Sequence, residues 1–225
     1  MNLLNEDILF KNEFLSITFG SMCSMKTITS IISVNTLSDI GLRCLYINHS
    51  YDERDTAGRS NEGNINTHHS SPPNLSKNVH CIKTDNLSSI DVSNFDFIQI
   101  DEGQFFNDIF FTVRYWVDTL KKKVSISALD GDSNRDIFNI QLMMLIPYAN
   151  VVRKSKGSCQ ICKSNYSYFS TRLTDSKEKI VVGGTDIYRT TCRDCYLETR
   201  PLDDDVTLKE RMISQLEALI NELKK

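Results

Sequence analysis

The stretch FLSITFGSMCSMKT, residues 14–27, decides how the rest of the chain is interpreted. Its first half is rich in β-branched and aromatic residues and predicts a short strand that ends at Gly20. From Lys26 onward, isoleucines at helical spacing predict a helix that ends near Gly41. A strand, a turn and a helix in this order are typical of an α/β fold with a ligand site at the end of the strand.

The turn matches the pattern G-x-x-x-x-G-K-[ST] of a phosphate-binding loop, except that Met25 replaces the second glycine. Lys26 would lie beside the β- and γ-phosphates of a nucleotide, Thr27 would ligate magnesium, and the helix N-terminus would attract the anion. Because glycine lets backbone N–H groups approach a phosphate closely, we expect Met25 to crowd the phosphate or to reshape the loop. Alone, the turn is explained equally well by an incidental Lys-Thr pair. The candidate ATP site comprises Gly20, Ser21, Met22, Cys23, Ser24, Met25, Lys26 and Thr27.

The rest of the first two-thirds of the chain repeats this alternation. Apolar runs predict further strands at residues 42–49, 79–83, 95–100, 124–129 and 150–153. A helical pattern follows Asn107, a good N-cap, and another covers residues 137–146. Residues 55–73 are polar and lack periodicity, which predicts a long loop. The alternation predicts a parallel sheet flanked by helices on both faces.

Two acidic residues follow the apolar strand predicted at residues 95–100. A phosphate-loop protein needs an acidic residue on a neighbouring strand to support magnesium, and Asp101 has this position. Glu102, one residue on, could reach a substrate hydroxyl as a general base. An ordinary polar strand end is the alternative. The acidic pair and the phosphate loop together favour nucleotide chemistry.

Four of the seven cysteines form two identical pairs, Cys159-x-x-Cys162 and Cys192-x-x-Cys195. Two such pairs can place four thiolates around a zinc ion in a closed, structural site that clips the segment between them. Unrelated thiols or a redox pair are the alternatives, and the repeated spacing favours zinc. Cys23, Cys44 and Cys81 are interpreted as packing or incidental thiols.

Changes in composition predict three parts: a nucleotide-binding domain at residues 1–155, a small zinc-binding domain at 156–200, and an amphipathic C-terminal helix at 201–225. The helix would dock on the body or pair with another subunit, and docking is favoured. Its apolar residues recur at helical spacing: Leu208, Met212, Leu216, Leu219 and Leu223.

Composition excludes several classes of protein. Of the 225 residues, 40% are hydrophobic and 24% charged, which excludes a wholly disordered chain. The net charge of −3 lacks the basic excess of a protein that grips nucleic acid by its phosphates. No apolar run is long enough to cross a membrane, and the N-terminus is unlike a signal peptide. We therefore expect a cytoplasmic protein with no nucleic-acid or membrane partner.

Several motifs, in order and at compatible spacing from about residue 14 to 196, resemble the thymidine kinases of the cellular and poxvirus type. The run DEGQFF at residues 101–106, followed by Asp108, resembles a signature of that family. SALDG at residues 127–131, with Arg135 and Phe138, resembles another. Further matches are Asp52-x-Arg54, Thr67-His68, and VGGTDIY at residues 182–188 ahead of the second cysteine pair.

This resemblance implies a P-loop NTPase-like fold with a zinc-clipped "lasso" that closes over a nucleoside. It implies transfer of the γ-phosphoryl group of ATP to the 5′-hydroxyl of thymidine, with Glu102 as general base. It also places Asp52 and Arg54 near the phosphates. The nucleoside-pocket positions it implies are Met22, Phe105, Leu129, Phe138, Val181, Val182, Gly183 and Tyr188.

The resemblance further implies ATP, Mg²⁺ and structural Zn²⁺ as cofactors and a homotetramer (or dimer) as the assembly. The chain departs from the family pattern at Met25, at Ser21 in place of proline, at Asn48 in place of lysine, and at Ser133, where an aromatic pocket residue is expected. Two functions therefore stay open. One is an active thymidine kinase, and the other is a weakened or inactive homologue that binds a nucleotide or a partner.

Overall fold

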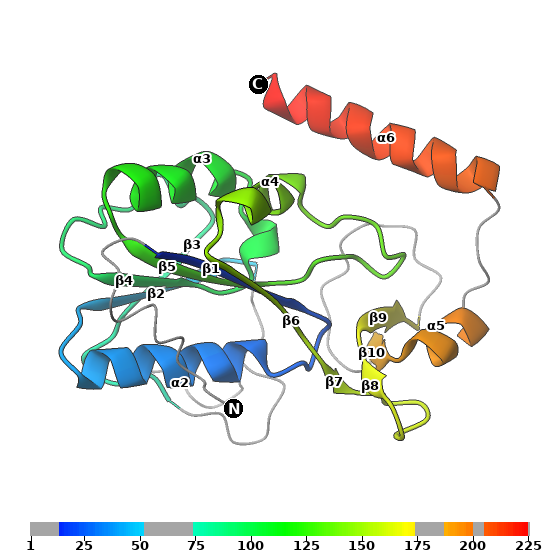
Figure 1. Cartoon of the computed structure of the whole chain (residues 1–225), viewed down its shortest axis with the longest axis horizontal. Helices are drawn as coiled ribbons and strands as arrows, with labels where there is room; N and C mark the ends of the chain where they lie inside the picture. Colours follow the sequence, from blue (N-terminus) through cyan, green and yellow to red (C-terminus); the bar gives the residue numbers. More distant parts are fainter. Residues whose placement is uncertain (1–13, 52–73, 174–186, 200–204, 225) are drawn as a thin grey trace.

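The computed structural model describes residues 14–51, 74–173, 187–199 and 205–224. Six parallel strands form one sheet in the order β3-β2-β4-β5-β1-β6, which confirms the predicted parallel α/β architecture (Figure 1). The strands are β1 (Phe14–Gly20), β2 (Cys44–His49), β3 (His80–Thr84), β4 (Phe97–Ile100), β5 (Lys123–Ala128) and β6 (Val151–Ser155). They lie close to the predicted positions.

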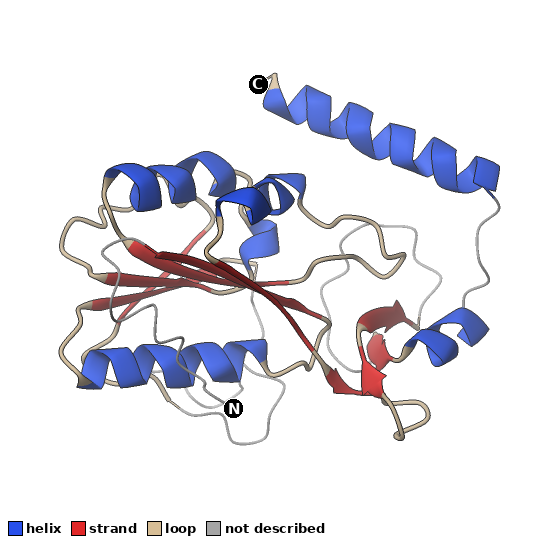
Figure 2. Ribbon diagram, viewed as in Figure 1, coloured by secondary structure: helices blue, strands red, loops and turns tan. Residues whose placement is uncertain are grey.

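Helices cover both faces of this sheet (Figure 2). Helix α2 (Lys26–Asp39) packs on one face, where Ile31, Val34 and Leu37 are buried. Helices α3 (Ile109–Arg114) and α4 (Ile140–Met144) lie on the opposite face. Alternate residues of β1 point to that second face, where Leu15, Ile17 and Phe19 join the larger core. This two-sided burial explains the apolar strands.

The region predicted as one helix after Asn107 is more irregular. Asp108, not Asn107, precedes α3, and α3 passes directly into a π-helical turn, η2 (Tyr115–Thr119). The wide turn keeps Trp116 and Val117 buried, while Leu120 is partly exposed. The predicted helix at 137–146 is α4 followed by a 3₁₀ turn, η3 (Ile146–Tyr148). Both predicted helices are thus present with their apolar faces buried, but each ends in a non-α turn.

A smaller unit follows β6 and is built from short antiparallel pairs. Strands β7 (Gly157–Ser158) and β8 (Tyr166–Ser167) pair with each other, as do β9 (Phe169–Arg172) and β10 (Tyr188–Thr191). Helix α5 (Arg193–Thr199) follows β10. A backbone hydrogen bond from Leu173 N to Ile187 O, 2.8 Å long, extends the β9–β10 pair by one step. The residue boundaries of the three predicted parts stay a proposal.

Helix α6 (Asp205–Leu223) lies beside the body (Figure 1). We expected the apolar face of this helix to dock on the body. The apolar side chains of Leu208, Met212 and Leu216 are instead exposed, so this face is not packed on the described residues. Arg211, on another face, pairs with Asp136 of the body at 3.0 Å. The side chains of Leu219 and Leu223 lie outside the described set.

Among the described residues, no helix combines the length and apolarity needed to cross a membrane.

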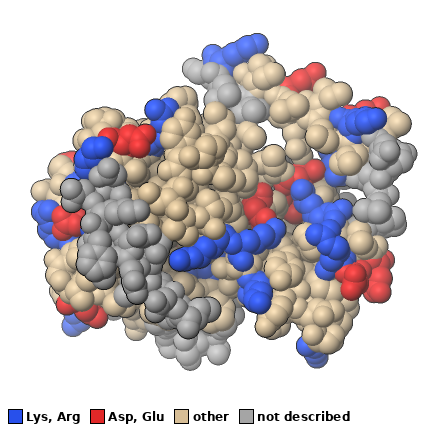
Figure 3. Space-filling model, in the orientation of Figure 1, with Lys and Arg blue, Asp and Glu red and all other residues tan. Residues whose placement is uncertain are grey.

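On the face shown in Figure 3, Lys and Arg side chains gather near the middle of the molecule with acidic side chains beside them. Lys154 of β6 forms an ion pair with Asp130, at 2.5 Å.

Candidate active site

The predicted phosphate loop joins the end of β1 to the start of α2. Gly20 is required there, since a Cβ at this position would lie 2.9 Å from the carbonyl oxygen of Ser155 on β6. The Lys26 ammonium lies across the loop and donates to the carbonyl oxygens of Gly20 and Ser21, at 2.9 and 2.8 Å. Burial lowers the pKa of Lys26, whereas nearby Glu102 and Asp101 raise it. The loop therefore holds a cation close to two carboxylates.

Met25 has a left-handed backbone, with φ 64° and ψ 14°, and forms the N-cap of α2. Cys23 is left-handed as well, with φ 54°. Glycine adopts this conformation freely, whereas a residue with a Cβ adopts it at a cost of about 1 kcal/mol or more. The Met25 side chain is 52% exposed. The loop thus keeps a conformation that suits glycine at a position where this chain has methionine.

The buried carboxylate of Asp101 follows β4. Its Oδ2 accepts a hydrogen bond of 2.9 Å from the hydroxyl of Tyr46 on β2, and the side chain of Thr27 also bonds it. Burial, reinforced by the charge of Glu102, raises the pKa of Asp101 to about 7, while the bonds from Tyr46 and Thr27 and the charge of Lys26 oppose the rise. Asp101 and Thr27, predicted from two distant motifs, are therefore in direct contact.

Glu102 opens the 3₁₀ turn η1 (Gly103–Phe105), and its backbone is also left-handed, with φ 53° and ψ 41°. Its Oε2 accepts a hydrogen bond of 2.6 Å from the side-chain amide of Gln104. Glu102 raises the pKa of Lys26, so it lies at the same end of the sheet as the phosphate loop. The end of β4 thus carries two acidic residues beside the lysine.

Aromatic rings gather next to this acidic corner. Phe105 contacts Phe138 edge to face, with 5.6 Å between ring centroids, and it also lies 5.5 Å from the buried ring of His49. Tyr51 packs on both His49 and Phe105. Burial lowers the pKa of His49, and the charges of Asp85, Glu102 and Asp108 oppose this. Phe105 and Phe138, two predicted pocket positions, therefore belong to one aromatic wall.

Other predicted pocket positions lie on different elements. The backbone N–H of Leu129, just after β5, donates to Gln104. The backbone N–H of Met22 donates to the hydroxyl of Ser170 on β9, at 3.1 Å, which joins the phosphate loop to the smaller unit. Tyr188 lies on β10, where its hydroxyl accepts a bond from Arg172. Five predicted site residues lie outside the described residues: Asp52, Arg54, Val181, Val182 and Gly183.

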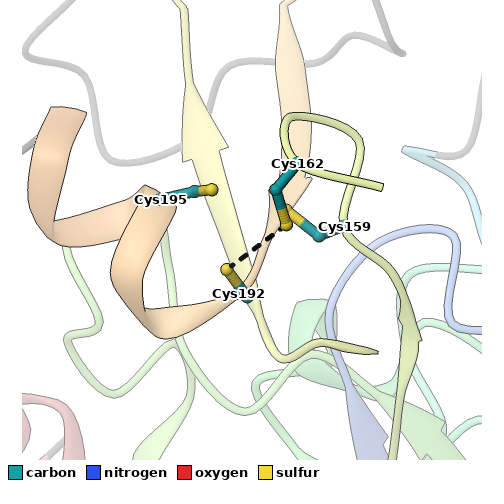
Figure 4. Close-up of side chains that lie close together, drawn as sticks. All are labelled: Cys159, Cys162, Cys192 and Cys195. Carbon is teal, nitrogen blue, oxygen red and sulfur yellow. Dashed lines mark hydrogen bonds between the residues drawn. The ribbon is translucent and has the colours of Figure 1, made fainter. Parts of the chain in front are cut away.

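The two cysteine pairs come together in the smaller unit, as Figure 4 shows. The sulfurs of Cys159, Cys162, Cys192 and Cys195 all lie within 4.8 Å of one another. Zinc–sulfur bonds of about 2.3 Å in a tetrahedron place sulfurs about 3.8 Å apart, and Cys162 and Cys192 are 3.9 Å apart. Hydrogen bonds from Ser164 lower the pKa of Cys162 to about 6. The donor set and its spacing fit a closed zinc site.

Tyr196 on α5 makes two further contacts between this unit and the sheet domain. The Tyr196 hydroxyl of α5 donates to the carbonyl oxygen of Ser133 at 2.9 Å. The guanidinium of Arg135 lies 4.7 Å from the centroid of the Tyr196 ring, within the range of a cation–π contact. Ser133, where the family pattern led us to expect an aromatic residue, is buried and serves this contact through its backbone.

The sequence analysis missed His49 and Tyr51 of the aromatic wall, and it also missed Tyr46, Gln104 and Asn139. Tyr46 sits inside an apolar strand and has no motif. Gln104 belongs to the DEGQFF run, so its position two residues after Glu102 could have indicated a contact between the two side chains. Asn139 caps α4, and its amide also donates to the carbonyl oxygens of Gln104 and Phe106. That second role depends on tertiary structure.

The sheet, the loop after β1 and the acidic end of β4 define a phosphate-loop nucleotide-binding protein of the α/β class. The sequence model of the thymidine kinase family matches residues 13–196, and the chain therefore belongs to the thymidine kinase family.

Individual relatives agree with this assignment. The thymidine kinase of Amsacta moorei entomopoxvirus is 34% identical over 191 residues, covering 81% of this chain and 97% of the relative. That of Yaba monkey tumor virus is 33% identical over 190 residues, covering 84% and 97%. The cytosolic thymidine kinase of Gallus gallus is 32% identical over 187 residues, covering 83% and 78%.

Proposed function

We propose that this chain transfers the γ-phosphoryl group of ATP to the 5′-hydroxyl of thymidine, giving dTMP and ADP. The observation that carries the proposal is the meeting of Lys26, Thr27, Asp101 and Glu102 at one end of the sheet in a member of the thymidine kinase family. In the reaction, the 5′-oxygen bonds to the γ-phosphorus as the bond to the ADP oxygen breaks. Glu102 accepts the hydroxyl proton.

Other residues would bind and orient the two substrates. Lys26, which bonds oxygens of the loop within the described part of the chain, would turn its ammonium to the β- and γ-phosphates. Asp52 and Arg54 are proposed to lie near the phosphates. The thymine and sugar would rest against Phe105 and Phe138. The other proposed contacts are Met22, Leu129, Tyr188 and the backbone of residues 181–183.

A magnesium ion fits the donors at the end of β4. The Asp101 carboxylate is buried, and burial and the charge of Glu102 raise its pKa, so a cation bound nearby would offset both effects and keep the carboxylate ionised. The Thr27 hydroxyl adds a second hard oxygen donor in contact with it. When bound there, magnesium would neutralise charge on the phosphate oxygens.

A non-catalytic role is the alternative, and nothing favours it over kinase activity. A protein that only binds a partner has no need of a buried lysine, a magnesium-type carboxylate and a nearby general base in one place. The departures at Met25 and Ser133 leave this arrangement in place.

The test is nucleoside-dependent ADP release by the purified chain with Mg²⁺ and ATP. We expect ADP release that rises with thymidine, and dTMP as the product. ATP hydrolysis unchanged by any deoxynucleoside, with no phosphorylated nucleoside formed, would refute the proposal.

We also propose that zinc holds the smaller unit in shape so that it covers the nucleoside. Metal analysis should give one zinc per chain. Chelation should weaken thymidine binding, measured by calorimetry, before the sheet domain melts, because the cysteine pairs join β7–β8 to the start of α5. A zinc-free protein with unchanged thymidine affinity would contradict this role.

The remaining proposals concern the setting of the protein. We propose a cytoplasmic location, consistent with reduced cysteines and with a Gallus gallus relative described as cytosolic. We propose a homotetramer or dimer, and no nucleic-acid or membrane partner, on the family resemblance and the acidic net charge.

A further inference from the structure

The side chain of Gln104 connects the proposed general base to the next strand of the sheet. It is buried, with 3% of the residue exposed. Its Oε1 accepts a hydrogen bond of 2.9 Å from the backbone N–H of Leu129. Because that partner can only donate, the amide oxygen must face Leu129 and the Nε2 must face Glu102. The 2.6 Å bond to Glu102 is therefore donated by the amide to the carboxylate.

The backbone around Gln104 is held as firmly as its side chain. A Cβ at Gly103 would lie 2.6 Å from Cγ2 of Ile126, so glycine is needed for the turn to press against β5. Asn139 donates to the carbonyl oxygens of Gln104 and Phe106, at 3.1 and 3.0 Å. Its own Oδ1 accepts from the backbone N–H of Leu142, which fixes it at the start of α4. The donor to Glu102 is thus anchored from β5 and from α4.

Glu102 needs such a support because its side chain is long and only partly buried, and its backbone is left-handed. A carboxylate free to change rotamer would spend little time at the distance that proton transfer requires. Displacements of about 1 Å can cost about 10²-fold in rate. A short, charge-assisted bond from an anchored donor selects one rotamer.

We infer that Gln104 is a positioning residue that holds the Glu102 carboxylate in its reactive orientation and at a set distance from the nucleoside pocket at Leu129. The inference rests on the proposed function. Gln104 acts through Glu102 and does not itself need to touch a substrate. A residue that merely stabilises the turn would be equally buried, so the test must separate these roles.

The discriminating variant is Gln104→Glu, made in the wild-type chain and in Glu102→Gln. Gln104→Glu keeps an oxygen that can accept from Leu129 and, once the new carboxyl group is ionised, removes the donor to Glu102. Because that group can still donate while it is protonated, kcat is measured across the pH range. We expect kcat for thymidine phosphorylation to fall about 10- to 100-fold, with KM for thymidine and ATP changed less than about 3-fold. In the Glu102→Gln background, the same change should lower the residual kcat by less than about 3-fold, since no base remains to be positioned.

Two further variants serve as controls. Gln104→Leu removes both side-chain bonds, so it should match Gln104→Glu in kcat and lose more thermal stability. Gln99→Leu is a matched removal of a buried glutamine, because Gln99 bonds Ile100 and Ser127 and its amide is not directed at Glu102. Any effect of Gln99→Leu on kcat should be the same in both backgrounds.

Each outcome decides one question. Equal losses from Gln104→Glu in both backgrounds, or a loss confined to KM, would overturn the positioning role while leaving the kinase assignment intact. A wild-type chain without nucleoside-dependent turnover would overturn the proposed function, and this inference with it. A loss of kcat that disappears in the Glu102→Gln background would establish that Gln104 acts through Glu102.

Discussion

The phosphate loop and the corner after β4 both place a residue with a Cβ in the left-handed region, Met25 at φ 64° and Glu102 at φ 53°. They differ in what the side chain does. Met25 is half-exposed, and only its backbone conformation serves the loop. Glu102 points its carboxylate to an anchored amide beside Lys26. The strained backbone at Glu102 therefore directs a side chain with a proposed chemical role. The strained backbone at Met25 costs stability, and its side chain has no comparable role.

The strongest test of this contrast is Glu102→Gln. If the side chain is the reason for the strained backbone, kcat should fall by about 10²-fold or more with little change in thymidine affinity, because a general base typically contributes that much. Steady-state kinetics and calorimetric titration would measure the two quantities.

Glu102→Gly is the control that relaxes the backbone as well. It should lose turnover to the same extent as Glu102→Gln, since relief of strain cannot replace the carboxylate. Turnover close to that of the unmodified chain in either variant would remove Glu102 as the base.

A smaller effect is expected at the phosphate loop. Met25→Gly should raise kcat/KM for ATP and stabilise the chain by up to about 1 kcal/mol, because relief of the left-handed strain slightly exceeds the entropy cost of glycine. For a domain of this size that is a rise of about 2–4 °C or less in Tm. Scanning calorimetry and ATP titrations would measure both.

Met25→Ala separates the two explanations for the loop. It removes the bulk of the side chain and keeps the Cβ, so a gain shared by Met25→Ala and Met25→Gly would indicate crowding of the phosphate. A gain seen with Met25→Gly alone would indicate backbone strain. No gain, or a loss, with glycine would show that the surrounding loop has adapted to methionine.

The parts of the structure that could be predicted are those that leave a repeated pattern in the sequence. The parallel sheet was predictable because buried strands are apolar on both faces and alternate with helices, as β1 and α2 show. The cysteine pairs were predictable because their spacing is rare by chance. Thr27 and Asp101 were both predicted to support magnesium, and the hydrogen bond between them in the structure was not predicted.

What the sequence did not predict depends on tertiary contacts. The π-helical turn after α3 has no signal in the sequence, since Trp116 and Val117 follow Val113 at ordinary helical spacing and are buried in the structure. Gln104, Tyr46 and Asn139 matter through partners 25 to 55 positions away in the chain. The exposed apolar side chains of α6 follow a pattern that usually indicates docking, so the pattern alone did not distinguish a covered face from an open one.

The hydrogen bond between Leu173 and Ile187 has a consequence for how this protein can evolve. It holds positions 173 and 187 together at the end of the β9–β10 pair, so strand pairing already includes the entropy cost of bringing these two positions close. Loop-closure entropy grows only logarithmically, and doubling the length costs about 0.6 kcal/mol. Changes of length between these two residues should therefore cost the scaffold little stability, whereas changes that displace residues 181–183 should alter the proposed nucleoside contacts.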